Sequence, residues 1–148
     1  MSAAPATTVG WREWVALPSL DIDRIKAKVD TGARTSALHV ENLELDDDGD
    51  ITVARFEVLP RQRHDEERVV ASATVTDRRE VRSSSGAVDL RPVIQTEITI
   101  AGTTVLAELT LTNRDEMGFR MLVGREALRP TFLVDPGRSY LGGRPARP

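Results

Sequence analysis

Two neighbouring segments of this 148-residue chain alternate between core-forming and polar residues with the period of a β-strand. In residues 92–100 the inward-facing set is Ile94, Thr96, Ile98 and Ile100, and in residues 103–112 it is Val105, Ala107, Leu109 and Leu111. Only Ala101 and Gly102 separate the two runs, so the pattern predicts a tight β-hairpin. Helical periodicity is scarce elsewhere, while Val, Thr and Ile are frequent. We therefore expect a mostly-β domain of short strands.

The remaining chain contains further short strand signals. They cover residues 11–17, 22–29, 44–50, 51–59, 69–76, 121–123 and 132–134. Residues 125–128 can form one helical turn before Pro130. Turns or loops are expected at residues 46–50, 60–68, 83–86 and 135–137. The acidic run 46–50 lacks the ligand spacing of a calcium loop and predicts a solvated hairpin tip. We expect one domain over residues 10–141, a disordered leader over 1–9 and a flexible tail over 142–148.

Composition excludes several classes of protein. The chain has no cysteine, so it can form neither disulfides nor thiolate metal sites, and it suits a reducing compartment. A net charge of −3 argues against non-specific nucleic-acid binding. No run approaches the roughly 20 apolar residues of a membrane span. We expect a cytoplasmic protein that binds neither nucleic acid nor membrane.

The motif Asp30-Thr31-Gly32 directly follows the alternating strand 22–29. A carboxylate at a sharp turn after a strand is what an aspartic peptidase needs, because two such groups share one proton and activate a water. The threonine hydroxyl can hydrogen-bond to the opposite loop. The nearest other candidate is Asp135-Pro136-Gly137, in which proline cannot replace that hydroxyl. The second carboxylate must then be Asp30 of another copy, which predicts a two-fold homodimer.

Three blocks of sequence carry a family resemblance. They are residues 26–39 around the Asp-Thr-Gly motif, residues 82–86 with 91–94, and residues 117–128. In order and spacing the chain resembles the retropepsin-like aspartic endopeptidases, and within them a bacterial group labelled ATP-dependent zinc proteases. The resemblance implies a closed-barrel-like acid-protease fold with one short helix after Gly124. It covers roughly residues 10–141.

The resemblance also implies roles for individual residues. Asp30 is the expected catalytic acid and base, with Thr31 and Gly32 in the catalytic loop and Gly124 packed against that loop. Expected substrate-binding residues are Lys28, Ala33, Arg34, Arg82, Ser84, Ser85, Gly86 and Arg91. Members of the group are associated with glutamate-adding ATP-grasp ligases. We therefore hypothesise an acidic or glutamate-rich peptide substrate and such a ligase as a partner.

Alternative interpretations stay open at this point. Arg78, Arg79, Arg82 and Arg91 are either a solvated charged face or ligands for acidic peptides. Lys28 and Arg34 near Asp30 indicate an acidic pH optimum, a negatively charged substrate, or binding without cleavage. The second candidate function is a non-catalytic peptide-binding or regulatory module of the same fold. A metal-dependent peptidase is the third, but His39 and His64 do not form a zinc-peptidase motif, so we expect no metal and no cofactor.

Overall fold

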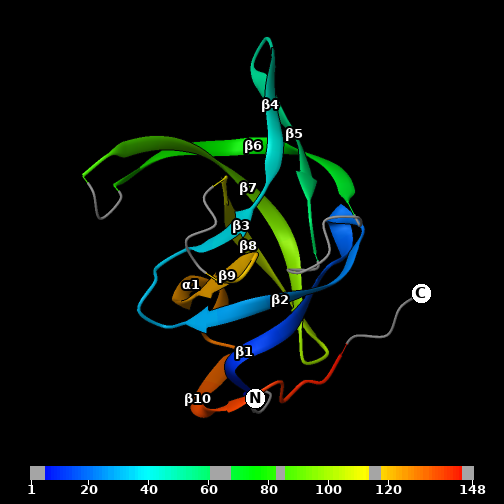
Figure 1. Cartoon of the computed structure of the whole chain (residues 1–148), viewed down its shortest axis with the longest axis vertical. Helices are drawn as coiled ribbons and strands as arrows, with labels where there is room; N and C mark the ends of the chain where they lie inside the picture. The colour runs from blue at the N-terminus through cyan, green and yellow to red at the C-terminus, as the bar shows by residue number, and fades with distance from the viewer. Residues whose placement is uncertain (1–5, 61–67, 83–85, 114–117, 145–148) are drawn as a thin grey trace, which may run out of the picture.

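The computed structural model describes residues 6–60, 68–82, 86–113 and 118–144 (Figure 1). Two short helical segments are η1 (Pro18–Leu20) and α1 (Arg125–Leu128). The strands are β1 (Thr7–Leu17), β2 (Ile22–Asp30), β3 (Ser36–His39), β4 (Glu41–Asp48), β5 (Ile51–Val58), β6 (Val69–Arg82), β7 (Val88–Ile100), β8 (Thr103–Thr112), β9 (Met121–Gly124) and β10 (Phe132–Ser139).

Six of these strands close into a β-barrel. They pair in the order β1-β2-β9-β3-β8-β7, and β7 returns to β1 through the pairs Val15–Ile100 and Ala16–Thr99. The inward faces of the strands fill the barrel with fully buried aliphatic side chains, among them Ile25, Leu38 and Leu109. The mostly-β, closed-barrel prediction and the single helix after Gly124 are confirmed.

The hairpin predicted from alternation is also confirmed. β7 and β8 pair in register from Val93–Thr110 to Ile100–Thr103. Ala101 and Gly102 both have positive φ angles, 51° and 79°, as a two-residue hairpin turn requires. Strand β7 begins four residues earlier than expected, at Val88, because it continues past the barrel as the partner of β6.

Regular structure begins earlier and continues further than the sequence indicated at both ends of the described residues. β1 begins at Thr7, inside the range expected to be a leader, because Thr7–Val9 pair in parallel with residues 132–134 of β10. The turn expected at 135–137 is wrong, since β10 continues to Ser139. Pro136 is tolerated there because β10 lies at the end of the strand order, where a missing N–H breaks no ladder.

A buried glutamate fixes both ends of the domain. Glu13 is fully buried, and its carboxylate accepts hydrogen bonds from the backbone N–H groups of Gly10, Leu141 and Gly142 at 2.7–3.1 Å. Gly142, the first residue of the predicted tail, is thus tied to the barrel. Three backbone donors satisfy a charge that would otherwise be costly to bury.

Two further differences concern the middle of the chain. Residues 69–82 form one strand, β6, rather than a strand followed by a charged segment, because pairing with β7 resumes after an irregularity between Val75 and Asp77. β3 was not predicted. The expected loop at 60–68 and turn at 83–86 fall largely on residues 61–67 and 83–85, outside the described residues. No described helix is long and apolar enough to cross a membrane.

Candidate active site

Asp30 is the last residue of β2, and its side chain lies on the outward face of the barrel. Burial alternates along the strand, with Ile25, Ala27 and Val29 in the core and the intervening side chains only partly buried. Successive side chains of a strand point to opposite faces, so Asp30 shares its face with Lys28 and Lys26. The carboxylate is therefore accessible at the point where the chain leaves the barrel.

The turn after Asp30 is closed by the aspartate itself. The Gly32 N–H donates to Asp30 Oδ1 at 2.9 Å, and the Ala33 N–H donates to the Asp30 carbonyl at 3.2 Å. Thr31 and Gly32 are exposed. One carboxylate oxygen is thus oriented by the backbone, while the threonine lies on the surface of the single chain.

Strand β9, the parallel neighbour of β2, supports this loop. β9 runs parallel to β2 and sets Gly124 opposite Asp30. A Cβ atom on Gly124 would lie 2.5 Å from the Thr35 carbonyl oxygen, so only glycine fits. The Gly124 N–H donates to the buried Ser36 Oγ at 3.0 Å. The predicted packing of Gly124 against the loop is confirmed, and Ser36 is a support that the sequence did not reveal.

The first turn of α1 completes the support. The N–H groups of Arg125 and Glu126 donate to the carbonyls of Ala33 and Arg34 at 2.8 and 3.1 Å. The first N–H groups of a helix have no acceptor within the helix, and here the carbonyls of the loop accept their hydrogen bonds. Figure 1 shows α1 beside the end of β2. We call Ser36, Gly124 and the first turn of α1 the brace.

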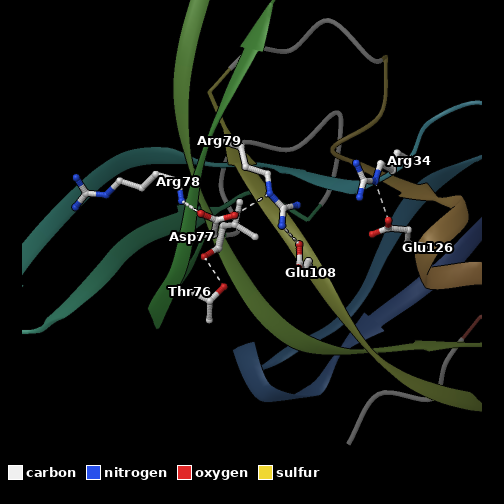
Figure 2. A network of polar contacts seen from close by, with 8 residues as sticks. Arg34, Thr76, Asp77, Arg78, Arg79, Glu108 and Glu126 are labelled. Carbon is white, nitrogen blue, oxygen red and sulfur yellow. Dashed lines mark hydrogen bonds and ion pairs between the residues drawn. The ribbon is translucent and has the colours of Figure 1, made fainter.

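Arg34 lies against the brace (Figure 2). Its Nε donates to Glu126 Oε1 at 2.8 Å, and this hydrogen bond holds the pKa of Glu126 below its ordinary value of 4.5. Arg125 donates from its guanidinium to the Gly32 carbonyl at 3.3 Å. The charge of Arg34, a predicted substrate-binding residue, is therefore largely compensated within the chain.

Carboxylates also compensate two arginines of the β6–β7 hairpin, Arg79 and Arg78. Arg79 contacts Asp77 at 2.9 Å and Glu108 at 2.5 Å, and its bond to Glu108 raises its pKa (Figure 2). A hollow of about 170 Å³, lined in part by Glu108 and Glu126, lies beside these pairs. Arg78 pairs with Asp47 at 3.2 Å. These contacts favour the intramolecular charged face over a free anion site.

The other predicted residues belong to the β6–β7 hairpin and not to the loop that follows Asp30. Arg91 lies on β7, mostly buried, 3.7 Å from Asp89. Arg82 is exposed at the end of β6, and Gly86 has a φ of 86° that suits a hairpin tip. Ser84 and Ser85 lie outside the described residues. The substrate-binding roles of these residues stay predictions.

On the outward face of β1 and β2, cations lie beside aromatic rings instead of carboxylates. Arg12 of β1 pairs in register with Lys28, and Trp14 pairs with Lys26. The Arg12 guanidinium lies 4.6 Å from the Trp11 ring centroid and 5.0 Å from that of Tyr140. We call Arg12, Lys26 and Lys28 the cation face. The sequence placed the two lysines on one side of a strand but gave no sign of Arg12 or the rings.

The closed barrel, the Asp-Thr-Gly turn at the end of a strand and the glycine of a parallel strand behind it define the retropepsin-like class of fold. The chain belongs to the RimB-like family: the profile described as "Retropepsin-like aspartic endopeptidase RimB" matches residues 8–145. This range includes the barrel from Thr8 onward, the brace and the cation face.

Similar proteins share both sequence and fold. A probable alpha-L-glutamate ligase of Shewanella halifaxensis is 43% identical over 137 residues, which are 92% of this chain and 30% of that protein. One from Parasynechococcus marenigrum is 42% identical over 132 residues, 89% of this chain and 28% of that protein. The chain thus spans less than a third of these curated relatives. A crystal structure of a Legionella pneumophila protein of unknown function has a TM-score of 0.75 at 22% identity, covering 93% of this chain and 99% of that one.

Proposed function

We propose that this domain is an aspartic endopeptidase that works as a homodimer, with Asp30 of each copy forming the catalytic pair. The observation that carries the proposal is Asp30 at the exposed end of β2, with one oxygen held by the Gly32 N–H at 2.9 Å. The family membership supports the reaction class. One Asp-Thr-Gly motif per chain supports a shared site.

The two edges of the sheet support a particular dimer interface. β4 at one end of the strand order carries the exposed residues Asp46, Asp47 and Asp48, and such charges prevent edge-to-edge pairing. β10 at the other end exposes 61% of Leu133. Residues 132–134 of β10 carry no charge, and an uncharged edge segment with an exposed leucine suits pairing with the same edge of a second copy.

The proposed chemistry follows from two carboxylates close together. Like charges about 3 Å apart do not both ionise, so the pair holds one proton. The ionised member takes a proton from a water as the water oxygen attacks the peptide carbonyl. The protonated member stabilises the carbonyl oxygen, and a proton then passes to the leaving amine. Because the pair supplies both acid and base, this step uses neither metal nor nucleotide.

The relatives support an acidic substrate. Each carries a segment more than 40% identical to this chain inside a protein named a probable alpha-L-glutamate ligase. A domain joined to a ligase in some proteins is a candidate to act with that ligase in others. We infer an acidic or glutamate-rich peptide as substrate, a glutamate-adding ligase as partner, and the cytoplasm as the compartment.

A peptide-library cleavage assay across pH 3 to 8 tests the proposal. Wild type should cleave, and Asp30→Asn should lose turnover while keeping its fold and its dimer. Chelator should leave the activity unchanged; loss on chelation with recovery on adding zinc would instead support a metal-dependent peptidase.

The second candidate is a non-catalytic peptide-binding or regulatory module of the same fold. Its supporting observation is that the curated relatives are named for ligation, not hydrolysis. It predicts that wild type binds an acidic peptide or a ligase yet cleaves nothing at any pH in the range.

A further inference from the structure

The cation face continues directly from the catalytic residue. Lys26, Lys28 and Asp30 occupy alternate positions of β2 on one side of the strand. Alternate residues of a strand are about 6.6–6.8 Å apart. Arg12 adds a third positive charge across the β1–β2 ladder, directly opposite Lys28. The positive charges thus form a row that leads away from Asp30 along the outside of the barrel.

Aromatic rings, not carboxylates, contact two of these three cations, Lys26 and Arg12. Lys26 Nζ lies 5.2 Å from the Trp14 ring centroid, and the Arg12 guanidinium lies 4.6 Å and 5.0 Å from the ring centroids of Trp11 and Tyr140. Arg12 Nε also donates to Ser139 Oγ at 3.1 Å. Within the described part of the chain, none of the three cations forms an ion pair. A ring orients a cation without cancelling its charge, so the row stays available to an anion.

We propose that the cation face is an extended subsite that binds the carboxylate side chains of an acidic peptide segment lying outside the scissile bond. An extended peptide repeats its same-side carboxylates at the spacing that separates Lys26 from Lys28. Arg12 adds a planar guanidinium, which suits carboxylates. This inference rests on the proposed function for the position of the scissile bond, and it extends that function by naming residues that select the substrate.

The rings argue against nucleic acid as the occupant. Single-stranded nucleic acid binds cationic surfaces chiefly by stacking its bases on free aromatic faces. Here Lys26 and Arg144 each lie 5.2 Å from the Trp14 centroid, and Arg12 covers Trp11 and Tyr140. The rings are thus already engaged by cations, and acidic side chains need only the cations.

The test measures binding in an Asp30→Asn background, so that cleavage does not interfere. Hexaglutamate, hexaglutamine and an oligothymidylate of six nucleotides are titrated by calorimetry at low and high salt. The subsite predicts binding of hexaglutamate alone, weakened by salt. Lys26→Gln or Lys28→Gln should each weaken binding about two- to fivefold, and the double variant about tenfold.

Arg55→Gln is the matched control, because it removes one exposed positive charge from β5 without touching the cation face. It should leave hexaglutamate affinity unchanged. Any of three results would overturn the inference. Hexaglutamate could fail to bind at all, the double lysine variant could bind it as tightly as the Asp30→Asn protein does, or the oligonucleotide could bind more tightly than hexaglutamate. If the wild type cleaves no peptide but hexaglutamate binding depends on Lys26 and Lys28, the proposed hydrolysis is contradicted and the subsite is supported.

Discussion

The two sides of Asp30 use their positive charges in opposite ways. On the brace side, Arg34 forms an ion pair with Glu126 at 2.8 Å, and backbone hydrogen bonds join the loop to α1. On the cation face, Lys26 and Arg12 lie over aromatic rings. A carboxylate partner fixes a loop but cancels its charge, whereas a ring leaves the charge in place. The brace therefore holds the loop that follows Asp30, whereas the positive charges of the cation face have no carboxylate partner among the described residues.

The largest effect on stability is expected at the centre of the brace. Gly124→Ala places a methyl group 2.5 Å from the Thr35 carbonyl oxygen, and the nearest atoms are all backbone atoms of Ala33 and Thr35, which no side-chain rotation can move away. We expect a loss of about 3 kcal/mol in the free energy of unfolding, measured by urea denaturation. Gly137→Ala is the control, since its nearest contact is an ordinary 3.5 Å, and it should change stability by less than about 0.5 kcal/mol. Equal effects of the two changes would contradict the brace.

Ser36→Ala should have a smaller effect. It removes the hydroxyl that accepts the Gly124 N–H at 3.0 Å and leaves that donor buried without a partner. The expected cost is about 1–2 kcal/mol by the same denaturation measurement. Ser72→Ala, on an exposed position of β6, should be nearly neutral. A neutral Ser36→Ala would show that the loop is held by backbone contacts alone.

The Arg34–Glu126 pair should make a weaker, pH-dependent contribution to the stability of the fold. Because the pKa of Glu126 is lowered by its bond to Arg34, the pair stabilises the fold above pH 4.5 and loses this effect as pH falls through the lowered pKa. Thermal melts of wild type and Glu126→Gln should therefore differ at pH 6 and converge toward pH 3. A difference that grows with acidity would have the wrong sign for this pair.

The smallest effect on stability is expected on the cation face. Lys26→Gln combined with Lys28→Gln removes charges that have no carboxylate partner among the described residues, so the free energy of unfolding should change by less than about 0.5 kcal/mol. Arg55→Gln gives the baseline for an exposed cation. A loss of more than 1 kcal/mol would mean that this face supports the fold as the brace does.

The sequence predicted those parts of the fold that local patterns encode. Alternation located β2 and the β7–β8 hairpin, and the Ala101-Gly102 turn fixed that hairpin's register. β3 was missed because four residues carry little periodicity, and its partners β8 and β9 lie far along the chain. The extension of β1 to Thr7 depends on β10, more than a hundred residues away.

The same limit applies to the site. Asp30 and Gly124 were found because their motifs are local. The partner of Arg34 lies 92 residues away at Glu126, and Arg12 reaches Lys28 only through the β1–β2 register. The sequence therefore identified the charged residues but could not tell which of them the fold neutralises.

A shared pair of Asp30 carboxylates is the central claim, and a mixed dimer tests it most directly. Wild-type and Asp30→Asn chains with different affinity tags are expressed together, and the heterodimer is isolated by two successive purifications. Its turnover of an acidic peptide should be about a hundredfold or more below that of the wild-type dimer, because one carboxylate cannot act as both acid and base. A heterodimer that keeps about half of the wild-type turnover, or an active chain that forms no dimer, would contradict the shared site.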